Sequence, residues 1–211
     1  MKYQEFKRRV KDLPLISSRQ VNALVKNKAV LKLQISKWCS QGLILRLKKG
    51  LYILNDTDRK ITPSVLFVAN QLVSPSYVSM EYALNFYGLI PERVEEITSV
   101  TAKKTSFFEN ALGRFRYQHI KESGYLGFKR IKEDNKLSFL IAEPEKAIVD
   151  FCYLNLRNFE DDTEEIFLES YRFQNLSGLK RRYLKRYALA FENRKLVNII
   201  ETLCNLVRKA E

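Results

Sequence analysis

One stretch of this sequence decides the fold of its first part: Leu31-Lys32-Leu33-Gln34-Ile35-Ser36-Lys37-Trp38-Cys39-Ser40-Gln41-Gly42-Leu43-Ile44-Leu45-Arg46-Leu47-Lys48-Lys49-Gly50-Leu51-Tyr52. On a helical wheel, Leu31, Ile35, Trp38 and Cys39 gather on one side, and Lys32, Ser36, Lys37 and Ser40 lie opposite. This pattern predicts a helix over residues 29–41, which ends at Gly42. Residues 43–47 and 51–54 predict two strands, joined by a loop whose Gly50 suits a bulged hairpin turn.

Two shorter helices are expected before this stretch. Tyr3, Phe6 and Val10 form one helical stripe, and Pro14 ends it. Ser17 and Ser18 then offer N-caps for a second helix, whose expected apolar face consists of Val21, Leu24 and Val25. Three helices followed by a hairpin with a basic tip predict a winged helix-turn-helix in residues 1–55.

The charge of the chain is concentrated in the same part. The 211 residues carry a net charge of +13. Residues 1–55 hold 13 Lys and Arg against 2 Asp and Glu, a net +11, whereas the other 156 hold 24 against 22, a net +2. Positive charge confined to one short module is typical of a surface that neutralises phosphates. A helix lying on a membrane surface is the alternative interpretation.

The rest of the chain predicts a mixed α/β domain with a helical C-terminal tail, so the fold class is α+β. Residues 56–63 are expected to form a linker, and residues 64–211 the second domain. Helices are expected over residues 64–73 and 79–87, strands over 96–101, 107–108, 114–120, 125–131 and 136–141, and a further helix from Glu143, with Pro144 in its first turn. The tail predicts helices near residues 163–173, 177–187 and 192–209.

Composition excludes several classes of protein. No apolar run approaches the ~20 residues of a membrane span, and the N-terminus has no signal-peptide pattern, so we expect a cytoplasmic protein. The three cysteines and the single histidine, His119, cannot supply the usual ligands of a zinc site. We therefore expect no metal and no cofactor.

The predicted partner of the first domain is double-stranded DNA. Lysine, arginine, serine and glutamine side chains contact phosphates and base edges, and an apolar side chain contacts the thymine methyl group. Leu33 has two interpretations, a contact to thymine or packing on the second helix, and the whole set has the alternative of an ordinary solvated cationic face. The predicted DNA-binding residues are Arg19, Lys32, Leu33, Gln34, Ser36, Lys37, Ser40, Gln41, Arg46, Lys48 and Lys49.

Signals for an enzyme are weak. The sequence contains no Gly-rich phosphate loop and no nucleophile elbow. A metal-dependent nuclease is the enzyme to consider, because carboxylates are plentiful, with Glu81, Glu143, Glu145, Lys146 and Asp150 as its candidates. Glu143, Glu145 and Lys146 fit better as the first turn of a helix. We therefore expect a protein that is not an enzyme.

Two features of the tail have two interpretations each. The basic residues Lys180, Arg181, Arg182, Lys185 and Arg186 either pair with the acidic run that includes residues 160–162 or contact a nucleic acid or an acidic partner. In the last helix, the apolar stripe Leu196, Ile200, Leu203 and Val207 is either core or the seam of a dimer on DNA.

The order of several motifs resembles one family. The stretch quoted first is similar to the winged-helix start of AbiEi-type antitoxins of type IV toxin-antitoxin systems. Four later motifs are similar to the second domain of this family: Ser76-Tyr77-Val78-Ser79-Met80-Glu81-x-Ala83-Leu84-x-x-x-Gly88-Leu89-Ile90-Pro91, Ile97-Thr98-Ser99-Val100-Thr101, Phe115-Arg116-Tyr117-x-His119-Ile120 and Ala142-Glu143-Pro144-Glu145-Lys146-Ala147-x-x-Asp150. The resemblance spans roughly residues 3–155.

The resemblance implies a DNA-binding autorepressor of an abortive infection system, which binds inverted repeats in its own promoter. Its second domain would counteract a nucleotidyltransferase toxin without forming a stable complex. The reading helix is then residues 31–41 and the wing tip residues 48–50. The candidate antitoxin residues are Tyr77, Glu81, Arg116, Glu145, Lys146 and Asp150. The alternative from the binding class is a winged-helix regulator whose second domain senses a ligand in a deep apolar pocket.

Overall fold

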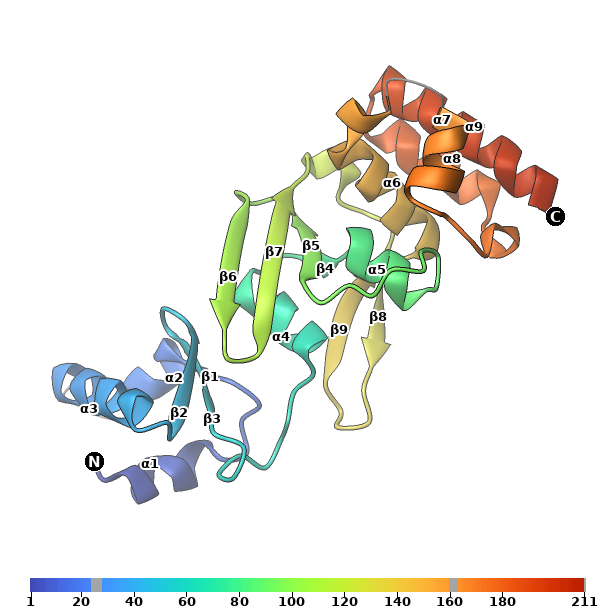
Figure 1. Ribbon diagram of the computed structural model, residues 1–211. Helices are drawn as coiled ribbons and strands as arrows, with labels where there is room; N and C mark the ends of the chain where they lie inside the picture. Colours follow the sequence, from blue (N-terminus) through green and yellow to red (C-terminus); the bar gives the residue numbers. More distant parts are fainter. Residues whose placement is uncertain (24–27, 160–162, 211) are drawn as a thin grey trace.

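The computed structural model describes residues 1–23, 28–159 and 163–210 and is a mixed α and β structure. The first unit packs helices against a small antiparallel sheet with strand order β1-β3-β2 (Figure 1). Its elements are α1 (Tyr3–Val10), β1 (Ile16–Ser17), α2 (Ser18–Ala23), α3 (Lys28–Ser40), β2 (Ile44–Lys48) and β3 (Leu51–Leu54). The three helices and the hairpin lie where the sequence predicts them, whereas Leu24 and Val25 lie outside the described residues.

The core of the first unit forms around Trp38. The indole ring packs against Tyr3 and Phe6, with ring centroids 5.5 and 5.0 Å apart. Leu31 and Ile35 are buried in the same cluster. This core fixes the orientation of α3, because Leu31, Ile35 and Trp38 all lie on one side of that helix.

The second unit is built on a six-stranded mixed sheet with strand order β6-β7-β5-β4-β9-β8 (Figure 1). The pairs β5–β7 and β4–β9 are parallel, and the others are antiparallel. The strands are β4 (Tyr77–Val78), β5 (Ile97–Thr101), β6 (Ser106–Asn110), β7 (Gly113–His119), β8 (Phe128–Lys132) and β9 (Ser138–Ala142). The helices that accompany them are α4 (Val65–Leu72), α5 (Met80–Phe86) and α6 (Pro144–Leu154).

The C-terminal helices complete the same core and are not a separate tail. They are α7 (Thr163–Glu165), which continues as a π-helical turn over Ile166–Ser170, α8 (Arg181–Ala190) and α9 (Arg194–Ala210). The α9 stripe Leu196, Ile200, Leu203 and Val207 is buried together with Val149 of α6. Of its two interpretations, core packing is therefore the one that the structure supports. No helix in the described part of the chain is long and apolar enough to cross a bilayer.

The two units are in direct contact through the hairpin. Leu47, Leu51 and Ile53 turn away from the first core and join the hydrophobic cluster of the second unit. The side-chain amide of Asn110, at the end of β6, donates a hydrogen bond to the carbonyl oxygen of Leu47 at 3.1 Å. In the expected linker, Asp58 accepts hydrogen bonds from the Tyr3 hydroxyl, at 2.6 Å, and from the Lys7 ammonium. The hairpin is thus shared between the two units.

Candidate nucleic-acid interface

The outer face of α3 carries polar and cationic side chains. Lys32, Ser36, Lys37 and Ser40 are exposed, as the helical wheel predicts. Leu33 lies on this face with 73% of its surface exposed. This exposure settles the position of Leu33, because a residue packed on α2 would be buried. An exposed leucine among polar residues is suited to touch a thymine methyl group.

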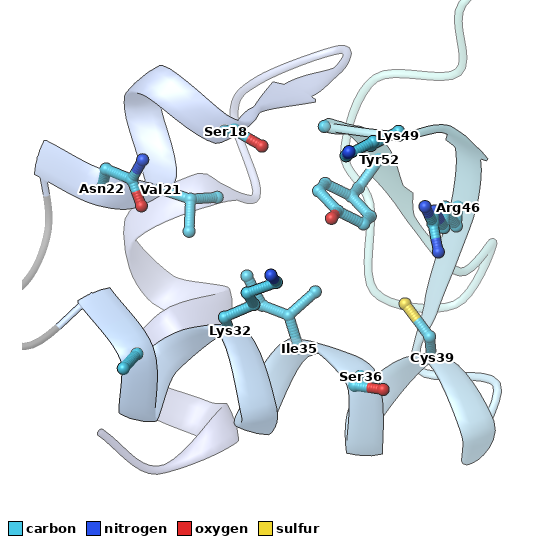
Figure 2. Close-up of a pocket in the computed structure, with 12 residues that line it drawn as sticks. Ser18, Val21, Asn22, Lys32, Ile35, Ser36, Cys39, Arg46, Lys49 and Tyr52 are labelled. Atoms are coloured by element: carbon cyan, nitrogen blue, oxygen red, sulfur yellow. The ribbon is translucent and has the colours of Figure 1, made fainter.

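A cavity of about 650 Å³ lies between α3 and the hairpin. Figure 2 shows Lys32, Ile35, Ser36 and Cys39 on α3, Ser18, Val21 and Asn22 on α2, and Arg46, Lys49 and Tyr52 on the hairpin. Lys32, Arg46 and Lys49 bring three positive charges to its wall, and none of the described residues that line it is acidic. Burial raises the pKa of the Cys39 thiol, which disfavours a negatively charged thiolate on this wall. The described wall of the cavity is therefore positively charged, and no negative side chain in it balances the three cations.

The hairpin that carries Arg46 and Lys49 depends on a glycine in its turn. Gly50 has a φ of +84°, which L side chains rarely adopt, and a Cβ atom there would lie 2.9 Å from the Ser18 hydroxyl oxygen. The strand register shifts between Arg46 and Lys48, as the predicted bulged turn requires. This turn places Lys49 on the cavity side of the hairpin.

Two predicted DNA-binding residues have other roles in the structure. Gln34 lies on the α1 side of α3, where its side-chain oxygen is 3.4 Å from the N-terminal ammonium of Met1. The Lys48 ammonium donates a hydrogen bond to the carbonyl oxygen of Leu72, and burial lowers the pKa of this lysine. Neither side chain lies on the exposed face of α3 or in the cavity. Arg19 and Gln41 are exposed and do not line the cavity.

Three of the antitoxin candidates form one buried polar cluster. Asp150 accepts hydrogen bonds from Tyr77 at 3.0 Å and from Ser79 at 2.7 Å, and it forms an ion pair with Lys146. The Lys146 and Asp150 side chains are both 0% exposed. Burial raises the pKa of Asp150 and lowers that of Lys146, while their ion pair opposes both shifts. A partner protein cannot touch this cluster, so its role here is to hold α6 against β4.

The nuclease candidates do not assemble into one site. Glu145 accepts a hydrogen bond from the backbone N–H of Lys180 at 2.9 Å, and Glu143 accepts one from the Tyr187 hydroxyl. Both contacts tie the start of α6 to α8, whereas Glu81 lines a polar cavity to which neither Glu143 nor Glu145 contributes. Within residues 1–23, 28–159 and 163–210, no group of three or more His, Cys, Asp or Glu side chains could hold a metal ion.

The two remaining antitoxin candidates lie at one polar cavity of about 370 Å³. Arg116 binds Glu96 through two hydrogen bonds, of 2.5 and 3.2 Å. Glu81 lies beside them, and its Oε2 atom is shielded and has no hydrogen-bond partner among the described residues. Burial raises the pKa of the Glu81 carboxyl group. Charged and polar groups dominate the wall, so this cavity differs from the deep apolar pocket that a ligand sensor would need.

Sequence reasoning missed several residues of this polar cavity, among them Glu96, Gln118 and Asn155. A signal existed for Gln118, because it follows Arg116 by two positions on β7 and a strand places such residues on the same face. No local signal marked Asn155, which reaches the cavity from the end of α6.

No model of a known protein family matches this chain, and no curated protein sequence matches it.

Proposed function

We propose that this chain is a DNA-binding transcription regulator, with α3 as the reading helix and the β2–β3 hairpin as the wing of a winged helix-turn-helix. One observation carries the proposal: the exposed polar face of α3 continues into a cavity with three positive charges and no described acidic residue. Duplex DNA carries one negative charge per ~1.7 Å of its axis, so a surface of this kind gains binding energy by releasing counterions.

The residues divide by the chemistry of their contacts. Lys37 and Lys49 are point charges suited to phosphates, which position the protein. Ser36 and Ser40 accept and donate hydrogen bonds, and Leu33 offers an apolar contact, which together suit base edges in the major groove. Arg46, on β2, lines the cavity and would hold the DNA backbone beside the groove. In this proposal the helix reads sequence while the wing supplies affinity.

The resemblance to AbiEi-type antitoxins, over roughly residues 3–155, extends the proposal to the second unit. It supports an autorepressor that binds inverted repeats in its own promoter, and a second unit that counteracts a nucleotidyltransferase toxin. Two chains would then occupy the two half-sites. Of the antitoxin candidates, only Glu81 and Arg116 lie at an open cavity, so they are the residues through which the second unit would act.

A salt-dependent titration tests DNA binding. The full chain is titrated against a duplex from its own upstream region and against a scrambled duplex of equal length, and we expect the specific duplex to bind ~10³ tighter. Replacing Lys37 or Lys49 by alanine should weaken binding to both duplexes and lower the slope of log K against log salt by ~1, because one phosphate contact is lost.

The matched control is Lys132→Ala. Lys132 is an exposed lysine at the end of β8, the sheet edge opposite to β6, so its removal changes net charge by the same amount without touching the proposed interface. An unchanged slope in Lys37→Ala and Lys49→Ala, or an equal fall in Lys132→Ala, would refute the assignment of these lysines to phosphates.

Growth rescue tests the antitoxin role. The full chain is co-expressed with the nucleotidyltransferase toxin that this proposal expects a neighbouring gene to encode, and colony counts are compared for wild type, Arg116→Ala and Arg114→Ala. Arg116→Ala should lose rescue, whereas the exposed neighbour Arg114 lies outside the polar cavity and its variant should retain rescue. Rescue by both variants would show that the polar cavity does not take part in antitoxin action.

A further inference from the structure

A second cationic groove lies where the two units meet. It has a volume of about 730 Å³ and is bounded by the tip of the hairpin, the end of α4 and the loop between β5 and β6. Three lysines line it, Lys48 from β2 and Lys103 and Lys104 from that loop. None of the described residues in its wall is acidic.

Two of the three lysines of this groove, Lys48 and Lys103, are held by hydrogen bonds, but their charge is not cancelled. Lys48 donates to the carbonyl oxygen of Leu72, and Lys103 donates to that of Ser74. The Leu72 oxygen lies at the C-terminal end of α4, where the helix dipole presents only partial negative charge, and the Ser74 oxygen is an uncharged backbone carbonyl just beyond the helix. The proximity of Lys103 adds to the effect of burial and lowers the pKa of Lys48, which indicates that the two ammonium groups repel each other. An anion in the groove would relieve this repulsion.

The tip of the hairpin lies between the junction groove and the proposed DNA surface. Lys48 lines the junction groove, and the next residue, Lys49, lines the cavity beside α3, so the tip of the hairpin separates two cationic surfaces. The contact between Asn110 and the Leu47 carbonyl, together with the packing of Leu47 and Leu51, holds this tip against the second unit. A ligand that spans the tip would meet both surfaces in a fixed geometry.

We propose that the second unit takes part in DNA binding, and that Lys103 and Lys104 hold phosphates of the duplex flanking the site read by α3. This inference rests on the proposed function, because a duplex is the anion long enough to cross the tip of the hairpin. The footprint on DNA would then extend from the first unit over the β5–β6 loop. Lys48 acts as a positioning residue, which fixes the wing against α4.

The experiment measures salt slopes of binding for the full chain. Lys104 is exposed, and its replacement by alanine should lower the slope by ~1 on a duplex that extends beyond the α3 site. On a duplex truncated to the α3 site, the slopes of Lys104→Ala and wild type should agree. Lys49→Ala should lower the slope on both duplexes, and Lys132→Ala should lower it on neither.

The outcomes separate this inference from the function on which it rests. If Lys49→Ala lowers the slope and both Lys103→Ala and Lys104→Ala leave it unchanged on the longer duplex, the DNA-binding function stands and the junction groove is not part of it. An equal fall for Lys132→Ala would show an effect of net charge alone and would also overturn the inference. Absence of salt-dependent binding by wild type would overturn both proposals.

Discussion

Lys146 and Asp150 face each other one turn apart on α6, and both side chains are fully buried. Removing one partner of such a pair leaves an uncompensated charge in the core, which typically costs ~3–5 kcal/mol. We therefore expect Lys146→Met to lower the free energy of unfolding by about this amount, as measured by urea denaturation. The loss comes from the stranded Asp150 carboxylate more than from the missing lysine.

A second variant separates these two causes. In Lys146→Met with Asp150→Asn, the amide oxygen still accepts hydrogen bonds from Tyr77 and Ser79, but no buried charge remains. The double variant should be more stable than Lys146→Met alone. If it is less stable, the ion pair itself, and not the stranded charge, determines the effect.

Glu81 makes stability depend on pH in a predictable direction. Burial raises the pKa of its carboxyl group above that in the unfolded chain, so the charged form is disfavoured in the folded protein. At a pH above the raised pKa this penalty is fully present, and it disappears as the pH falls through the raised pKa and then the unfolded one. Glu81→Gln should therefore raise Tm at neutral pH, with a difference that shrinks in acid.

The control for Glu81 is Glu95→Gln, because Glu95 is an exposed carboxylate near the same sheet. A pH-independent change of Tm in Glu81→Gln would contradict the assigned pKa shift. The sequence alone could not have predicted that Glu81 is shielded and Glu95 exposed, since nothing local to either glutamate fixes its burial. Burial of Glu81 arises from α5 packing on β5, which only the fold reveals.

At the scale of elements, the hairpin depends on the backbone conformation of Gly50. An L residue in the left-handed region costs ~1–2 kcal/mol, and a methyl group here would also meet the Ser18 hydroxyl. Gly50→Ala should therefore lose at least about this much stability and displace Lys49, so that binding to DNA weakens as well. Thermal unfolding and DNA titration measure the two effects. Gly178→Ala is the matched control, because a Cβ atom there meets nothing within 4 Å.

The sequence predicted those elements whose signals are local. The α3 helix and the hairpin carry a periodic pattern, glycines and a basic turn within one continuous stretch, and they were found there. The strands β1 and β4 were missed, because each has two residues and exists only through distant partners, such as Tyr52 for Ile16 and Val100 for Tyr77. Strand pairing with residues that are distant in the chain leaves no periodic pattern of apolar residues in the sequence.

The candidate sites show the same limit. One helical wheel was enough to predict that Lys32, Ser36 and Lys37 are exposed. The apolar side chains of α3 define its buried face, and the residues that cover this face are close in sequence. Tyr77, Lys146 and Asp150 were named as candidate antitoxin residues, and contact with a partner would require accessible side chains. They are buried because α8 and α9, which come much later in the chain, cover α6.

At the scale of the molecule, the shared hairpin predicts that both units unfold together. Trp38, the only tryptophan, lies in the core of the first unit, so its fluorescence reports on that unit alone. Far-ultraviolet circular dichroism reports mainly on the second unit, which holds most of the helical residues. Because Leu47, Leu51 and Ile53 belong to the second core, we expect the two probes to give the same denaturation midpoint.

Leu51→Ala tests the reason for this coupling. Removal of a buried leucine side chain typically costs ~2–5 kcal/mol, and here the loss falls on the contact between the units. If the contact couples them, the fluorescence transition should move to lower denaturant than the circular dichroism transition, so that the two midpoints separate in the variant. Separate midpoints already in wild type would show that the first unit unfolds independently. The hairpin would then not be held by the second unit, and the proposed rigid interface spanning the α3 cavity and the junction groove would lose its physical basis.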